Sequence, residues 1–176
     1  MPTIKPYQTV DETDVINLYA FSGVLPVNKG TFVKVISGWL PTQNLESLGS
    51  PGATYGNTVS LRYGVMPKCG KVTSSGDVTI GMLLYDVRNV DENGELLIFK
   101  PQKAAEMEVA ISGQAVPIAT KGVFLYSGVQ GNPTAGAAAY VDSNANLNVT
   151  GGGSTRVGTF LGPAEAGLVL FRLNVS

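Results

Sequence analysis

The chain has 176 residues, a formal net charge of -1 and twelve scattered Lys and Arg residues, which excludes a basic stripe of the kind that binds DNA or RNA. It contains no His and one Cys, so Ser-His-Asp and Cys-His catalytic sites and His- or Cys-based zinc sites are also excluded. Charged residues make up only 14%, while Gly stands at 22 and Pro at 10. This composition favours short strands joined by turns, and we expect a β-rich protein that uses no cofactor, metal or nucleic acid.

The apolar runs of the chain are much shorter than the 18 or so residues that cross a bilayer. Its start, MPTIKPYQTVDETD, lacks the apolar stretch of a secretion signal. We therefore expect no membrane partner and a protein that is made and kept in the cytoplasm of its producing cell.

Residues 1–26 combine three prolines with one short apolar run. Because proline interrupts a helix, this pattern predicts an extended N-terminal arm. The arm either folds back on its own core or lies on a neighbouring molecule. Six apolar and aromatic side chains of the arm are the candidate interface anchors: Tyr7, Val15, Ile16, Leu18, Tyr19 and Phe21. The rest of the chain, residues 27–176, is expected to form one β-rich domain.

Strand signals begin in TFVKVISGW, residues 31–39, which is rich in β-branched and aromatic residues. Phe32 and Ile36 alternate with Val33, Val35 and Trp39, so both faces of the strand are apolar. We therefore expect other parts of the protein to cover both faces. Residues 41–57 are dense in turn formers and predict a long surface loop.

Further short strands with turn signals between them follow to the end of the chain. They are predicted at 59–63, 78–87, 96–99, 106–111, 122–126, 138–141, 145–149, 156–161 and 168–175. In the last of these, Val169, Phe171, Leu173 and Val175 share one face. Many short strands without a long helical period indicate an all-β fold, either an antiparallel sandwich or a small barrel.

The glycine run Gly151-Gly152-Gly153 is the first candidate for a ligand loop. A phosphate-binding Walker loop needs a Lys and a following helix, whereas RVGTFLG here is strand-like. The run resembles the C-terminal segment of the dUTPase family only in glycine content. We predict instead that it is a flexible hairpin connection between two strands.

Asp91, Glu92 and Glu95 are the second candidate, since paired carboxylates serve glycoside hydrolysis. They surround an Asn93-Gly94 turn, where acidic residues act as turn formers. We interpret them as turn residues, and Cys69 as a small buried thiol.

Several segments resemble the capsid decoration, or cement, proteins of tailed bacteriophages of the small β-barrel type. The resemblance is carried by VNKGTFV (27–33), GMLLYDV (81–87), AVPIATKGV (115–123), AAYVD (138–142), RVG (156–158) and GLVLFRL (167–173). Together they span most of residues 27–173 as a pattern of glycine turns and apolar strands.

The resemblance implies a non-enzymatic virion protein on the outer surface of the head. Its partners would be the major capsid protein and neighbouring copies of the chain, often as a homotrimer, and it would bridge capsid subunits against internal DNA pressure. The alternatives are a carbohydrate- or receptor-binding virion module and a dUTPase-like nucleotide hydrolase.

Overall fold

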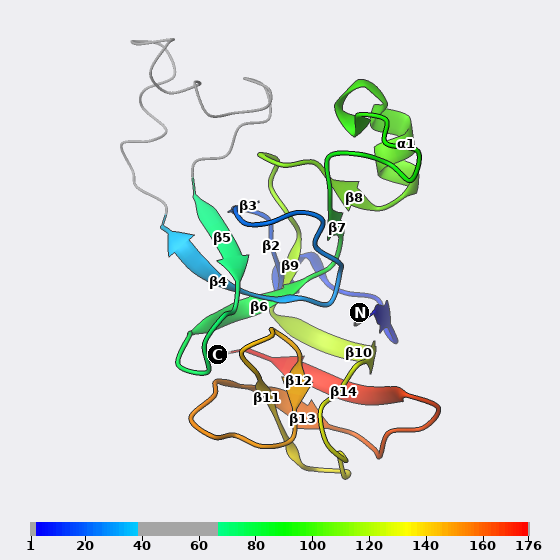
Figure 1. The fold of residues 1–176 in the computed structure, drawn as a ribbon. Coiled ribbons are helices and arrows are strands. Elements are labelled where there is room, and N and C mark those ends of the chain that lie inside the picture. Colours follow the sequence, from blue (N-terminus) through cyan, green and yellow to red (C-terminus); the bar gives the residue numbers. More distant parts are fainter. Residues whose placement is uncertain (1–2, 39–66, 176) are drawn as a thin grey trace.

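The fold is described by a computed structural model for residues 3–38 and 67–175, and it is all-β as expected (Figure 1). In this part of the chain the strands form two six-stranded sheets and one two-stranded pair. Sheet A contains, in spatial order, β1 (Ile4–Pro6), β10 (Lys121–Ser127), β14 (Leu168–Asn174), β13 (Arg156–Phe160), β11 (Ala138–Val141) and β12 (Leu147–Asn148). Sheet B contains β2 (Val15–Ile16), β9 (Ile118–Ala119), β6 (Thr79–Leu83), β4 (Phe32–Ser37), β5 (Lys68–Lys71) and β3 (Ala20–Phe21).

The main core lies between the two sheets. Phe124, Tyr126 and Phe171 of sheet A belong to the same buried cluster as Phe32 and Met82 of sheet B. The ring of Tyr126 stands edge-on to Phe171, with centroids 5.8 Å apart, and its centroid lies 6.3 Å from that of Phe32. Aromatic pairs at these distances add specific packing to the area that they bury, so the two sheets pack as a sandwich.

A second core lies on the other face of sheet B. Its members include Phe21, Val33, Cys69 and Ile118. Strand β3 pairs with β5, and Ala20 in β3 also bridges Ala115, three residues before β9. Sheet B therefore curls round this second core as a half barrel, and the fold combines features of both predicted architectures.

Strand β4 is covered on both faces, as the sequence predicted, but only over its first half. Phe32 and Val33 are both fully buried and belong to different cores. Val35 and Ile36 are exposed at 39% and 55%, so the double cover ends midway along the strand. Trp39, the predicted loop 41–57 and the predicted strand 59–63 lie outside the described residues.

Residues 86–111 form a small projection, here called the knob, in which one strand prediction was wrong and a second was confirmed over only two residues. The knob contains β7 (Asp86–Val87), the 3-10 helix η4 (Leu97–Phe99), helix α1 (Pro101–Glu106) and β8 (Val109–Ala110). The segment predicted as strand 96–99 is η4, and α1 occupies the start of predicted strand 106–111. Proline fixes its own φ near the helical value and is favoured at the first helical position, so Pro101 starts α1. The knob has its own small core of Leu97, Ala104, Val109 and Ile111.

Four predicted C-terminal strands are confirmed with small boundary shifts, namely β10, β11, β13 and β14. The predicted inward face of β14 is also confirmed, because Val169, Phe171 and Leu173 are buried. The glycine run does connect two strands, yet the predicted hairpin is wrong: β12 and β13 both pair with β11 and not with each other. Gly152 and Gly153 have φ of +42° and +88°, a region that glycine enters without steric cost, and this lets the connection pass round β11.

Candidate interaction surfaces

The N-terminal segment that was predicted as an arm folds back on the domain. It supplies β1 to sheet A and both β2 and β3 to sheet B. Phe21 is only 5% exposed and lies in the second core. Ile16 and Tyr19 pack against that core, and Val15 is half-buried on β2.

Only two of the six candidate anchors are well exposed, Tyr7 at 62% and Leu18 at 42%. The structure therefore does not gather the six side chains into one surface. Phe21 in particular fills the chain's own core, so it cannot serve as an anchor for a partner.

The outer face of sheet A carries apolar side chains on its two neighbouring strands β10 and β14. Phe124 and Tyr126 point inward from β10, so Val123 and Leu125 point outward, because successive side chains of a strand alternate. The same alternation turns Leu168, Leu170 and Arg172 outward from β14. The strand register pairs Leu125 with Leu170 and Val123 with Arg172, which places these outward side chains beside one another.

Two neighbours extend this outer face. The backbone N–H of Tyr7 donates to the carbonyl of Val123 over 3.0 Å, and that of Leu161 donates to the carbonyl of Leu170 over 2.8 Å. Both hydrogen bonds continue the register of the sheet, so Tyr7 and Leu161 face outward as well. We call the apolar set Tyr7, Val123, Leu125, Leu161, Leu168 and Leu170 the sheet-A face. Tyr7, Leu161 and Leu168 are exposed, and the other three are half-buried between them. The solvent side of an antiparallel sheet is ordinarily polar, and contiguous exposed apolar side chains mark interaction sites.

Positive charge surrounds the sheet-A face. Lys5, Lys121, Arg156 and Arg172 are exposed, and no ion pair joins any of them to a described residue. Arg156 lies along the outer side of β13, where it donates to the hydroxyl of Thr159 over 3.3 Å. One carboxylate, Glu165, lies opposite Leu168 at the margin. Four cations against one carboxylate leave this surface with a net charge of about +3.

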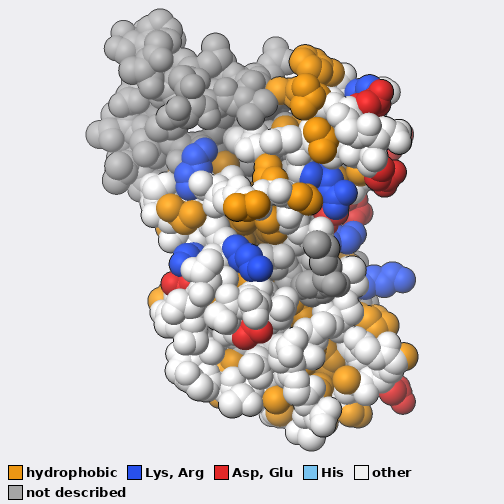
Figure 2. Space-filling model, in the orientation of Figure 1, with side chains coloured by type: hydrophobic (Ala, Val, Ile, Leu, Met, Phe, Trp, Pro, Cys, Tyr) orange, Lys and Arg blue, Asp and Glu red, His pale blue; other side chains and the backbone are white. Residues whose placement is uncertain are grey.

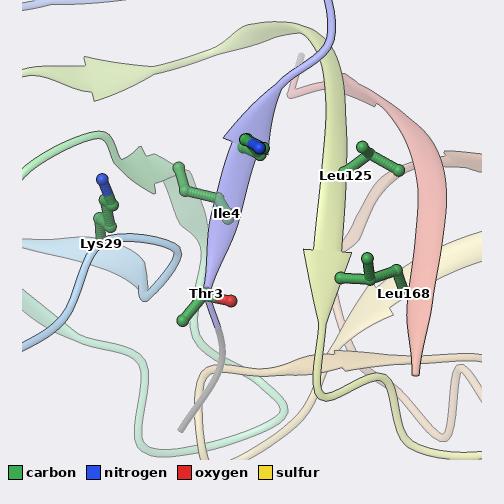
Figure 3. Close-up of a pocket in the computed structure, with 6 residues that line it drawn as sticks. Thr3, Ile4, Lys29, Leu125 and Leu168 are labelled. Carbon is green, nitrogen blue, oxygen red and sulfur yellow. The ribbon is translucent and has the colours of Figure 1, made fainter. Parts of the chain in front are cut away.

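A shallow hollow opens at the edge of the sheet-A face (Figure 3). It has a volume of about 260 Å³ and is lined by Thr3, Ile4, Lys5, Lys29, Leu125 and Leu168. A second hollow of about 150 Å³ shares Ile4 and Lys29 and extends to Tyr85 and Glu108. Both are below the usual size of about 300–1,000 Å³ for small-molecule pockets, so they suit single side chains of a partner better than a cofactor.

The knob carries a second exposed apolar group. Val90 bridges Leu96, and the N–H of Phe99 donates to the carbonyl of Leu96. Val90, Leu96 and Phe99 are all exposed within one short segment, and we call these three side chains the knob patch. Phe99 is exposed at 77%. Figure 2 shows hydrophobic side chains gathered at the end of the molecule that carries α1.

The knob is acidic. Residues 86–111 contain six carboxylates and three cations, a net charge of about -3. The cations are all paired within the knob, Arg88 with Asp86, Lys100 with Glu95 and Lys103 with Asp91. Glu108 pairs with Lys29, outside the knob, while Glu92 and Glu106 form no ion pair with a described residue. The two apolar surfaces of the molecule therefore have opposite charge.

Asp91 has the turn-forming role that its position in the sequence predicted. One carboxylate oxygen accepts from the backbone N–H groups of Asn93 and Glu95, both over 2.8 Å, and the other accepts from Lys103 Nζ. Gly94 completes the turn at φ +83°. Hydrogen bonding from Lys103 and then from the backbone lowers the pKa of Asp91 to about 2, so this carboxylate is a structural group.

Acid should loosen two turns of the fold. Asp77 accepts from Lys34 Nζ over 2.7 Å and from the backbone of Thr73 and Ser74, and these bonds lower its pKa to about 2, as for Asp91. A pKa that is lower in the folded state adds stability above the unfolded value, and this stability is lost as pH falls through the folded value. Urea midpoints should therefore fall between about pH 4 and pH 2, and they should fall less steeply in Asp91→Asn. A midpoint that stays level across this range would contradict the assignment.

The remaining candidate chemistry is sparse in the described ranges. Cys69 is buried as predicted, and burial raises the pKa of its thiol to about 11. Residues 3–38 and 67–175 bring together no three His, Cys, Asp or Glu side chains that could hold a metal ion. The same residues include no helix that is long and apolar enough to cross a membrane. In comparisons with known proteins, no family model and no curated protein matches the chain.

The sequence carries a signal for the sheet-A face. Residues 121–127 (KGVFLYS) and 168–174 (LVLFRLN) carry apolar side chains on both faces, whereas a half-buried strand needs them on one face only. Tyr7 was predicted as an anchor, but Leu125 and Leu170 were not. Their proximity depends on the pairing of β10 with β14.

Proposed function

We propose that this chain is a non-enzymatic structural protein of a virion, which binds the outer surface of an icosahedral phage head and bridges its major-capsid subunits. The resemblance to decoration proteins supports the viral setting. One structural observation supports the bridging role: sheet A lies at one end of the molecule and the knob at the other (Figure 1), and each has an exposed apolar surface. A protein that holds neighbours together needs two contact surfaces.

The proposed contacts are made by surfaces of the folded domain, because the N-terminal segment belongs to its sheets. Aromatic side chains are common energetic centres of interfaces, and Tyr7 and Phe99 are exposed on the two surfaces. A ligand that binds only the assembled, expanded shell stabilises that shell by mass action. The proposed partners are the major capsid protein and neighbouring copies of the chain, as a homotrimer.

Cosedimentation with expanded, DNA-free heads that lack the protein tests this function. We expect saturable binding and a higher temperature of shell rupture. Tyr7→Ser/Leu168→Ser should weaken binding about tenfold or more, since each change removes an exposed apolar contact. Val78→Ser is the matched control, because Val78 is 75% exposed and belongs to neither surface. Absence of binding to any head would reject the proposal, and turnover of dUTP or binding to glycans would replace it by one of the alternatives.

A further inference from the structure

The sheet-A face and the knob patch match each other in chemistry. Each has exposed apolar side chains, Tyr7, Leu161 and Leu168 on one and Val90, Leu96 and Phe99 on the other. The charge is about +3 around the sheet-A face and about -3 over the whole knob, where Glu108 is already paired with Lys29. Specific interfaces combine an apolar centre with a polar rim. Complementary potentials across such a rim speed association and suppress wrong partners.

We propose that the knob patch of one copy docks on the sheet-A face of the next copy. This inference rests on the proposed function and assigns the two surfaces to the contact between neighbouring copies, so that linked copies together, and not one chain alone, span neighbouring capsid subunits. It needs no shell for its test. The two surfaces differ, so the contact is heterologous, and each chain offers one surface to each of two neighbours. Heterologous contacts of this kind form a closed ring or an open filament.

The sizes of the two surfaces are consistent with this contact. Phe99 is the most exposed side chain of the knob patch, and the larger hollow at the edge of the sheet-A face has a volume of about 260 Å³. An apolar cavity of about 150 Å³ holds a benzene ring, so the hollow has room for one phenyl ring. Leu125 and Leu168 line it and come from the neighbouring strands β10 and β14 (Figure 3), while Lys5 adds positive charge at its wall.

A second copy is the occupant that the charges favour. The cations of the knob are already paired, which leaves Glu92 and Glu106 to face a partner. On the sheet-A face, Lys121 and Arg172 are exposed and form no ion pair with a described residue. Within one molecule Glu108, at the base of the knob, pairs with Lys29 at the wall of the hollow over 3.0 Å. Helix α1 and sheet A lie toward opposite ends of the molecule (Figure 1), so Glu106, which ends α1, can meet Lys121 and Arg172 only between copies.

Analytical ultracentrifugation of the purified full-length chain tests the contact. In about 50 mM NaCl we expect a mass above the 18.4 kDa of the monomer that rises with concentration. In about 500 mM NaCl the association should weaken, because higher salt shortens the distance over which exposed charges attract one another. A monomer at every concentration in low salt would overturn the proposal.

Charge reversal makes the test specific. Lys121→Glu/Arg172→Glu and, separately, Phe99→Ser should each weaken association about tenfold or more. Addition of Glu92→Lys/Glu106→Lys to the first variant should restore it, a gain that a merely misfolded variant cannot show. Lys71→Glu, an exposed cation on β5 outside both surfaces, is the control and should leave the association unchanged.

The outcomes separate this contact from the proposed function. The contact would be rejected if Lys121→Glu/Arg172→Glu associates like the wild type. It would also be rejected if the addition of Glu92→Lys/Glu106→Lys fails to restore association. A wild-type chain that is monomeric in solution yet binds heads would leave the proposed function standing and overturn the contact. Salt-sensitive association without head binding would support the contact and reject the function.

Discussion

Gly158→Ala is expected to destabilise the fold by at least about 3 kcal/mol, or to prevent folding altogether. Gly158 is buried in β13, where it pairs with Ala139 of β11 on one side and with Leu173 of β14 on the other. A Cβ atom at this position would overlap the backbone carbonyl of Arg172. Since a paired backbone cannot rotate away as a side chain can, β13 and β14 would have to separate.

The measurement is urea unfolding followed by far-UV circular dichroism, with Gly162→Ala as the matched control. Gly162 follows the same strand, and a Cβ atom there would have no atom within 4 Å. The control should therefore change the free energy of unfolding by less than about 0.5 kcal/mol. Equal stability of the two variants would show that β13 and β14 do not approach as closely as described.

Deletion of residues 1–21 is expected to abolish cooperative folding. The deletion removes β1, β2 and β3, which belong to two different sheets, and with them the buried side chains of Ile4, Ala20 and Phe21. The extended arm suggested by the sequence would have left a folded domain behind after the same deletion. Loss of the near-UV circular dichroism signal and of the thermal transition would distinguish these two outcomes.

Phe21→Ala tests the same point with one side chain. Truncation of a buried Phe to Ala costs about 3–5 kcal/mol, because the second core loses apolar contacts and gains a cavity. Val24→Ala, at a nearby position that is 90% exposed, should be close to neutral. If Phe21→Ala unfolds at the same urea concentration as the wild type, Phe21 does not fill the core and returns as a candidate anchor.

The alternative outcomes of these experiments also bear on function. A stable deleted domain that no longer binds heads would restore the draped arm as the shell contact. An unfolded deleted chain would leave the sheet-A face and the knob patch as the surfaces to test by point substitution. Of the six predicted anchors, only Tyr7 belongs to one of these two surfaces, the sheet-A face.

The candidate surfaces were only partly predictable for a physical reason. The surroundings of Tyr7 depend on neighbours that are distant in sequence, whereas those of Phe99 include the nearby Leu96. Tyr7 lies beside Val123, while Val90 and Leu96 meet through a local bridge. The charge of the knob could be counted along the chain, whereas the positive rim of the sheet-A face gathers residues 5, 121, 156 and 172 from four strands.

The sequence by itself determined the all-β class, the inward face of β14 and the turn role of Asp91, because period-two alternation and turn chemistry act over a few residues. Tertiary structure alone decided that the N-terminal strands join both sheets and that β12 and β13 flank β11. It also decided that sheet B curls round a second core. These features depend on long-range pairing, in which a segment takes the partner that buries its apolar face, and no local pattern specifies which partner that is.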